Sequence, residues 1–125
     1  MGDPRHELGL RAEAAVAGWL ERQGWEILAR RWRVAEGEID LVCCDTLAAL
    51  VGVEVRLRRS ERAGSGLESV DPRHLRRLRA ALGRFAGQAA ERTRFTALRI
   101  DLVTVSPTDR HGRWRAVRHA AIDAW

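Results

Sequence analysis

The fold is decided by residues 37–57, GEIDLVCCDTLAALVGVEVRL. Two runs rich in β-branched and apolar residues, 38–44 and 48–57, are separated by the turn formers Asp45 and Thr46. Runs of this kind on either side of a short polar turn are typical of two antiparallel strands. The pattern therefore predicts a β-hairpin.

The position of the turn sets the register of this hairpin. If the turn is centred on Leu47, Cys43 faces Val51 and Asp40 faces Glu54, because the members of each pair lie equally far from the turn. The two carboxylates then share one face of the sheet. Opposed strand residues have Cβ atoms about 4.5–5.5 Å apart, and like charges at that separation repel each other. We therefore expect a cation between Asp40 and Glu54.

A divalent metal suits this pair of carboxylates. Mg²⁺, or Mn²⁺ in its place, takes oxygen ligands, usually one or two carboxylates together with waters and a substrate phosphate. A metal held by Asp40 and Glu54 would activate water and stabilise charge on a phosphodiester. Arg56 leaves the strand on the same face as Glu54, where it would hold the phosphate.

The simpler alternative is that both carboxylates are solvated, or paired with Arg56 or Arg58. The feature that favours a metal site is the setting of Glu54, which stands between two valines in an otherwise apolar strand that should be well covered. Asp40 presents the same anomaly within the apolar run of residues 37–42.

Two helices are predicted, one before and one after the hairpin. Asp3-Pro4 is a helix start and Gly24 a helix stop, which gives a first helix over about residues 4–23. Asp71-Pro72 repeats the start signal, and the second helix runs to about Ala90. Helical spacing predicts an apolar stripe along the first helix, with Glu13 beside it. This stripe consists of Leu8, Ala12, Ala15, Val16, Trp19 and Leu20. In the second helix the same spacing predicts a core face of Leu75, Leu78, Leu82, Phe85 and Ala89, with Arg73, Arg76, Arg77 and Arg84 outside it.

Three further strands complete the predicted fold. In the first, residues 25–33, Trp25, Ile27 and Ala29 alternate with Glu26, Leu28 and Arg30. Residues 95–105 are apolar on both faces, as in a central strand, and residues 114–117 add a less regular one. Residues 58–70 are predicted to form a loop. The order of helix, three strands, helix and strand predicts a single α/β domain over residues 1–125, a sandwich of mixed strand direction.

The composition favours an anionic partner. The formal net charge is +5 and the pI is near 11.0, and nucleic acid is the commonest partner of a small basic domain, so we expect DNA. All 22 basic residues are arginines, which excludes a mechanism that needs a lysine. Adjacent cysteines, Cys43 and Cys44, point to opposite faces of a strand and are assigned structural roles. Trp19 and Trp25 fall at core-like positions, and none of the five tryptophans is assigned to binding.

No apolar run approaches the roughly 18 residues that a membrane span needs. The N-terminus carries Asp3, Arg5 and Glu7 and lacks the apolar centre of a signal peptide. A cytoplasmic location without membrane attachment is expected.

The sequence also resembles a known family. Residues 37–42, GEIDLV, followed by residues 53–59, VEVRLRR, look like the signature of the YraN-like family of small bacterial proteins. The family's N-terminal helix motif is similar to residues 8–15, and its later strand resembles Arg99 to Val103. This family is similar to archaeal Holliday-junction resolvases and other PD-(D/E)xK nucleases. The resemblance therefore implies a restriction-endonuclease-like fold with Glu13, Asp40 and Glu54 as acidic site residues.

Three residues of the pattern need separate comment. Arg56 stands where active PD-(D/E)xK nucleases typically have lysine, and His74 stands where family members often carry a lysine early in the second helix. A histidine can accept a proton near neutral pH, although a histidine on a helix surface is usually solvated. Asp101 could support the site from a neighbouring strand, but an ion pair with a nearby arginine is the more common arrangement.

Three functions follow from these patterns. The first is a divalent-metal-dependent, structure-selective DNA nuclease, with Arg58, Arg73, Arg76 and Arg77 on the DNA phosphates. The second is a nucleic-acid-binding protein on a nuclease fold without useful catalysis, which the absence of lysine favours. The third is a partner-binding domain with dispersed arginines and no acidic pocket. Cutting a branched junction would suit a homodimer with two-fold symmetry, though no residue indicates its interface.

Overall fold

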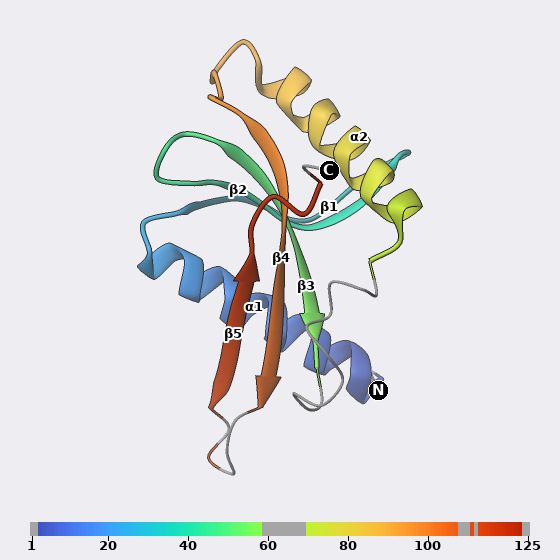
Figure 1. Ribbon diagram of the computed structural model, residues 1–125, viewed down its shortest axis with the longest axis vertical. Helices are drawn as coiled ribbons and strands as arrows, with labels where there is room; N and C mark the ends of the chain where they lie inside the picture. The colour runs from blue at the N-terminus through green and yellow to red at the C-terminus, as the bar shows by residue number, and fades with distance from the viewer. Residues whose placement is uncertain (1–2, 59–69, 108–110, 112, 124–125) are drawn as a thin grey trace.

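The computed structural model describes residues 3–58, 70–107, 111 and 113–123. Two helices and five strands follow one another along the chain (Figure 1): α1 (Pro4–Arg22), β1 (Glu26–Val34), β2 (Gly37–Cys44), β3 (Leu50–Leu57), α2 (Pro72–Ala89), β4 (Leu98–Pro107) and β5 (Trp114–His119). The strands form one sheet in the order β1-β2-β3-β4-β5. The predicted order of elements is confirmed, and residues 59–69 of the predicted loop lie outside the described residues.

The sheet has mixed strand directions, as predicted. β1, β2 and β3 are antiparallel neighbours, β3 and β4 are parallel, and β5 returns antiparallel to β4. α2 lies in the connection between β3 and β4, because parallel neighbours require a long crossover. The two helices cover opposite faces of the sheet (Figure 1), so the chain is an α/β protein with three layers.

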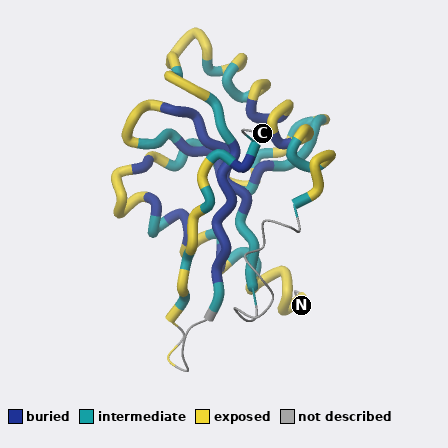
Figure 2. The backbone as a smooth tube through the Cα atoms, in the orientation of Figure 1, coloured by how far each residue is buried: buried dark blue, intermediate teal, exposed yellow. Residues whose placement is uncertain are grey.

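Two hydrophobic clusters hold the three layers together. The α1-side cluster consists of Val16, Ala17, Leu20, Trp25, Leu41, Cys43, Ala49, Val51, Val53, Val103 and Val105. The α2-side cluster consists of Ile39, Val42, Leu50, Leu78, Ala81, Leu82, Ile100, Leu102 and Ile122. Buried backbone is concentrated in the central strands, while the outer turns of both helices are exposed (Figure 2).

The helix boundaries follow the predicted capping signals. Asp3 Oδ1 accepts a hydrogen bond from Arg5 N at 3.0 Å, and Asp71 Oδ1 accepts one from Arg73 N at 2.8 Å. Gly24, with φ +91°, ends α1 in the left-handed conformation that glycine adopts readily. Neither of the helices in the described part of the chain is long and apolar enough to cross a membrane.

The predicted stripe of α1 is wrong at two positions. Leu8 is 37% exposed and Ala15 is exposed, whereas Ala17 is completely buried. The buried residues of α1 are Ala12, Val16, Ala17 and Leu20, so the contact with the sheet lies further round the helix than the predicted stripe. In α2 the predicted core face is confirmed at Leu78 and Leu82, and Ala81 joins it.

The predicted alternation of residues 25–33 is confirmed at Trp25, Ile27 and Leu28 and is wrong at Ala29. A β-bulge interrupts the pairing with β2 between Ile27 and Ala29. The extra residue places Leu28 and Ala29 on the same side, so both pack against the α2-side cluster while Ile27 packs against the α1-side cluster. Trp32 also packs against the α2-side cluster, and it follows Arg31, whose φ is +47°. β4 begins at Leu98, three residues later than predicted, and remains an interior strand; β5 extends two residues beyond its predicted end.

The predicted hairpin register is confirmed. Cys43 pairs with Val51 and Leu41 with Val53 across β2 and β3. Asp45 organises the turn, because its Oδ1 accepts hydrogen bonds from the backbone N–H groups of Leu47 and Ala49, both at 2.9 Å. The register therefore brings Asp40 opposite Glu54 if it is continued by one residue.

Candidate functional site

The site lies where β2 and β3 separate. Leu41 and Val53 form the last backbone pair at this end of the ladder. Beyond them, Asp40 Oδ2 accepts a hydrogen bond from the backbone N–H of Val55 at 2.8 Å. A side chain thus replaces the backbone acceptor that β3 loses, which fixes the Asp40 carboxyl at the fork between the two strands.

The regular alternation of β2 side chains between the two faces of the sheet is interrupted at Asp40. In a regular strand Ile39 and Leu41 would point to one face. Here Ile39 packs in the α2-side cluster and Leu41 in the α1-side cluster. Asp40 therefore lies at a local twist of β2.

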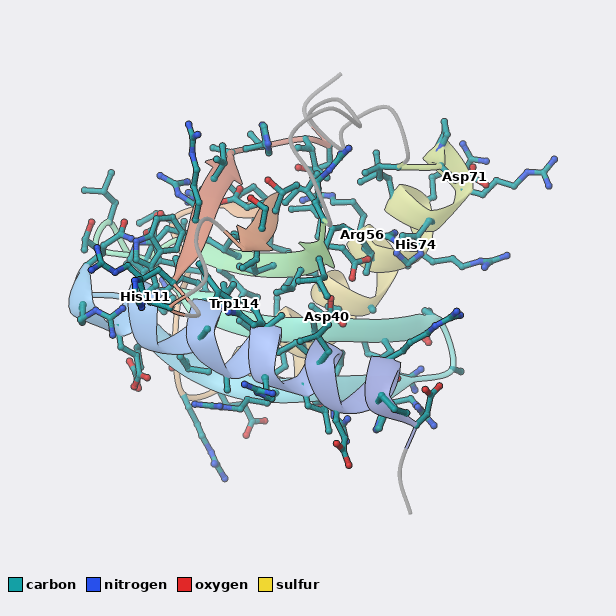
Figure 3. All side chains as sticks on the ribbon, turned by 90° about the horizontal axis from the view of Figure 1, so that it is seen from below. Asp40, Arg56, Asp71, His74, His111 and Trp114 are labelled. Atoms are coloured by element: carbon teal, nitrogen blue, oxygen red, sulfur yellow. The ribbon has the colours of Figure 1, made fainter. Side chains whose placement is uncertain are left out.

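Glu54 is buried on the face of β3 that α2 covers. It lies beside Leu102 of the α2-side cluster, and the residue is only 7% exposed. Its Oε2 atom lies 4.0 Å from Arg56 Nη2 and makes a short contact with His74 Nε2. Figure 3 shows Asp40, Arg56 and His74 close to one another.

The two carboxyl groups of the pair interact directly. Burial raises the pKa of Asp40 to about 8, and the hydrogen bond with Glu54 and its negative charge act in the same direction. The hydrogen bond from Val55 opposes this rise. At neutral pH Asp40 is therefore protonated and the two groups share a hydrogen bond, which removes the repulsion expected between two bare carboxylates.

Two nitrogen-bearing side chains border the pair. Arg56 Nε is buried and has no hydrogen-bond partner among the residues described, although the side chain as a whole is 42% exposed. Burial and the charge of Arg56 lower the pKa of His74, so its imidazole is neutral at pH 7. The predicted sharing of one face by Glu54 and Arg56 agrees with their 4.0 Å contact.

Glu13 approaches the pair from α1. It is half-buried, and desolvation followed by the charge of Asp40 raises its pKa. Asp40 is thus near enough to Glu13 for its charge to affect the Glu13 carboxyl group. Across residues 3–58, 70–107, 111 and 113–123, however, no three His, Cys, Asp or Glu side chains converge as a metal-binding group. A cation bound here would have two carboxylates as protein ligands and would take the others from water and substrate, which is a usual arrangement for Mg²⁺.

The candidate DNA-binding arginines lie next to this site. Arg73, Arg76 and Arg77 are exposed in the first turns of α2, the helix that carries His74, and Arg58 follows the end of β3. None of the four has an ion-pair partner within the described ranges. Arg84, further along α2, is different because its Nη1 lies 2.5 Å from Glu36 Oε1.

Asp101 belongs to another part of the structure. It lies beside Val53, on the face covered by α1, and is completely buried. Its carboxylate is 3.0 Å from Arg99 Nε and 3.0 Å from Arg118 Nη1. The predicted ion pair is confirmed.

The contact between His74 and Glu54 was not predicted. The sequence contains a signal for it, because His74 precedes the buried Leu78 by four residues and so lies on the same side of α2. Hydrophobic periodicity overlooks polar residues at the end of such a stripe.

The residues of this site lie in a region that matches a known protein family. Residues 12–105 match the uncharacterised protein family UPF0102. The chain belongs to this family. The resemblance to the YraN-like family is thereby confirmed, and the matched region of UPF0102 includes Glu13, Asp40, Glu54 and His74.

Relatives in the UPF0102 family come from diverse bacteria. A UPF0102 protein of Mycobacterium avium is 37% identical over 102 residues, which are 81% of this chain and 78% of the relative. One from Deinococcus radiodurans is 51% identical over 75 residues, 59% of this chain and 61% of the relative. One from Acidiphilium cryptum is 52% identical over 73 residues, 58% of this chain and 55% of the relative.

Proposed function

We propose that the chain is a divalent-metal-dependent DNA nuclease with a restriction-endonuclease-like fold. The observation that supports this most is the pair formed by the half-buried Asp40 and the buried Glu54 at the fork between β2 and β3. Two carboxyl groups held together in a poorly solvated position form a site that a divalent cation would stabilise. The resemblance to archaeal Holliday-junction resolvases supports the same fold and chemistry.

Asp40 and Glu54 would hold Mg²⁺ or Mn²⁺. The donor set fits, since both groups are oxygen ligands and the hydrogen bond from Val55 already holds the Asp40 carboxyl in place. Such a metal, when bound, activates water and stabilises charge on a phosphodiester. Glu13 adds negative charge near Asp40, which also favours a cation.

Arg56 would bind the reacting phosphate. Its guanidinium lies 4.0 Å from Glu54, and its Nε has no partner in the described part of the chain. A phosphate oxygen beside the metal would satisfy this donor and receive a charge-assisted hydrogen bond. Arg56 would thereby orient the substrate against the carboxylate pair.

The DNA backbone would extend over the N-terminal part of α2. Arg73, Arg76 and Arg77 are exposed there, and Arg58 follows the end of β3, two residues after Arg56. Contacts of these arginines with phosphates would position the duplex and carry no base specificity. Branched DNA is the proposed substrate, and a homodimer with two-fold symmetry would span such a junction.

A second function has specific support as well. His74 Nε2 contacts the Glu54 oxygen that a metal would need, and Arg56 stands where nucleases of this type typically have lysine. Both features favour a nucleic-acid-binding protein that keeps the fold without useful catalysis. Such a protein would bind DNA in a salt-sensitive manner and would not cut it.

Cleavage assays with isosteric variants separate the two functions. The wild type, Asp40→Asn, Glu54→Gln and the double variant are incubated with labelled branched, flapped, single-stranded and duplex DNA in Mg²⁺, Mn²⁺ or EDTA. The nuclease proposal expects metal-dependent cleavage that each substitution lowers by at least about 100-fold, because several kcal/mol of transition-state stabilisation are lost. Glu21→Gln, at an exposed position of α1, is the matched control and should cut normally.

Cleavage that survives in the double variant or in EDTA would contradict the proposal. Binding by every protein without cleavage of any substrate would establish the second function instead.

A further inference from the structure

A surface hollow lies on the α1 side of the sheet. Its volume is about 380 Å³, which lies within the usual range for ligand pockets. It is lined by Arg11, Ala15, Val16, Arg22, Val105, Trp114 and Ala116. Figure 3 shows Trp114 beside α1 and away from Arg56 and His74. The hollow is therefore separate from the carboxylate pair and its arginines.

The floor of the hollow is apolar and carries an aromatic ring. Val16 and Val105 belong to the α1-side cluster, and Trp114 packs against that cluster while remaining half-buried. A tryptophan ring that packs against the core and remains partly exposed offers a stacking surface for a planar group. Bases of single-stranded nucleic acid stack on aromatic rings in this manner.

Two arginines flank the apolar floor. Arg11 and Arg22 are eleven residues apart on α1, close to three full turns, so both lie on the same side of the helix and about 16 Å apart along its axis. Arg22 folds back along α1, since a Cβ atom at Gly18 would lie 3.4 Å from its Nη1. Because the two side chains leave α1 from different turns, they can contact different phosphates of one nucleic-acid strand.

The charges of the hollow are complementary to a polyanion. No acidic side chain is found among the described residues that line it. Arg11 and Arg22 are both exposed, and neither has an ion-pair partner in the described portion of the chain. Unpaired guanidinium groups on both sides of an aromatic ring suit a ligand with phosphates at its edges and a planar group between them.

We infer that this hollow binds unpaired nucleotides of a DNA strand, with a base on Trp114 and the flanking phosphates on Arg11 and Arg22. The inference rests on the proposed function for the choice of DNA as the polymer. It adds a second contact with the substrate, on the face of the sheet opposite Glu54. Such a contact would favour DNA that carries a single-stranded segment over plain duplex.

Fluorescence anisotropy with labelled oligothymidylate of about 15 nucleotides tests the inference. EDTA is present throughout, so that binding is measured without metal-dependent cleavage. Trp114→Ala should weaken binding by at least about 5-fold, the lower limit for the loss of one stacked base, while Trp114→Phe should stay close to the wild type. The double variant Arg11→Gln, Arg22→Gln should bind more weakly and with a smaller salt dependence.

Matched controls identify the origin of each effect. Arg92→Gln and Arg94→Gln remove exposed arginines beyond α2 and should leave affinity for the oligonucleotide nearly unchanged. An abasic strand of the same length keeps the phosphates, so it should bind more weakly than oligothymidylate and respond to the arginine variants only. An acidic peptide that binds as well as the oligonucleotide would overturn the assignment to nucleic acid. Circular dichroism melting checks that each variant is folded.

The two proposals can fail separately. Equal binding by the wild type, Trp114→Ala and the double arginine variant would overturn the inference, even if metal-dependent cleavage is observed. Hollow-dependent binding together with an absence of cleavage would leave the inference standing and contradict the nuclease proposal.

Discussion

The carboxyl oxygen Oδ2 of Asp40 lies 2.8 Å from the backbone nitrogen of Val55, from which it accepts a hydrogen bond. This bond joins β2 to β3 at the position where their backbone pairing ends. It orients the Asp40 carboxyl group, which also hydrogen-bonds with the side chain of Glu54. The acid is therefore held in place before any cation binds.

Asp40→Asn should stabilise the folded protein above pH 8. An asparagine can accept the bond from Val55 and donate to Glu54, so it mimics protonated Asp40. The folded-state pKa of about 8 lies above the unfolded value of 3.8, so the wild type loses stability as the pH rises from about 4 to about 8 and the variant avoids this loss. Urea unfolding at pH 5 and pH 8.5 measures the difference, which should be larger at pH 8.5.

At high pH, Mg²⁺ should reverse the order of stability of the wild type and Asp40→Asn. Metal binding displaces the proton of Asp40, so the wild type should gain stability from millimolar Mg²⁺ at pH 8.5 and Asp40→Asn should not. Equal gains in both proteins would mean that the metal binds elsewhere.

Arg56→Gln should raise the pKa of His74 toward its ordinary value of 6.5. After burial, the charge of Arg56 is the next cause of the lowered pKa. Because the folded-state pKa is depressed, His74 contributes stability above pH 6.5 that is lost as the pH falls through its folded-state pKa. Nuclear magnetic resonance titration of the imidazole measures the shift. Arg33→Gln, which removes an arginine paired with Glu38, is the control and should leave the pKa of His74 unchanged.

Replacing Arg73, Arg76 and Arg77 by glutamine should weaken binding to DNA by a similar factor whatever the base sequence. Each lost phosphate contact reduces the slope of log affinity against log salt by about 1. Titrations at several salt concentrations give this slope for the triple variant. Arg84→Gln is the control, because Arg84 is already bound to Glu36, and an equal effect of both changes would argue against a DNA contact on the first turns of α2.

Sequence patterns predicted most of the fold. The predictions that failed did so for local reasons. The hairpin register followed from a turn centred on Leu47, because strand pairing leaves few alternatives once the turn is known. The β-bulge in β1 was not predictable, since Leu28 and Ala29 fit either face of a strand. The buried face of α1 was predicted incorrectly because small residues such as Ala15 and Ala17 carry little information about which of them is buried.

The candidate site was predicted in part for similar reasons. The pairing of Asp40 with Glu54 is a consequence of register, which local sequence determines. The contact of His74 with Glu54 depends on how α2 lies across the sheet, and this depends on packing over residues that are distant in the sequence. The hollow beside Trp114 likewise joins α1 to β5, elements from opposite ends of the chain.

Gly24→Ala and Gly83→Ala should change stability in opposite directions. Gly24 has φ +91° and a Cβ there would lie 3.2 Å from Thr46 Cγ2, so alanine should lower the free energy of unfolding by about 1–2 kcal/mol. Gly83 lies within α2, and beyond its chain neighbours and the adjacent helix backbone no described atom lies within 4 Å of where its Cβ would be. Alanine should raise stability there by about 0.5–1 kcal/mol. Urea unfolding of both variants provides the comparison, and a stabilised Gly24→Ala would contradict the conformational argument.

Asp101→Asn should destabilise the protein and leave metal binding intact. The carboxylate is completely buried between Arg99 and Arg118, and its loss leaves Arg118 without this counter-charge and Arg99 with Asp45 as its remaining acidic partner. Breaking a buried ion pair from one side costs about 3 kcal/mol or more. The free energy of unfolding measures this cost, and calorimetric titration with Mn²⁺ below the melting temperature measures metal affinity. A folded variant that binds Mn²⁺ less tightly than the wild type would connect Asp101 to the carboxylate pair across the sheet, contrary to its place on the α1 side.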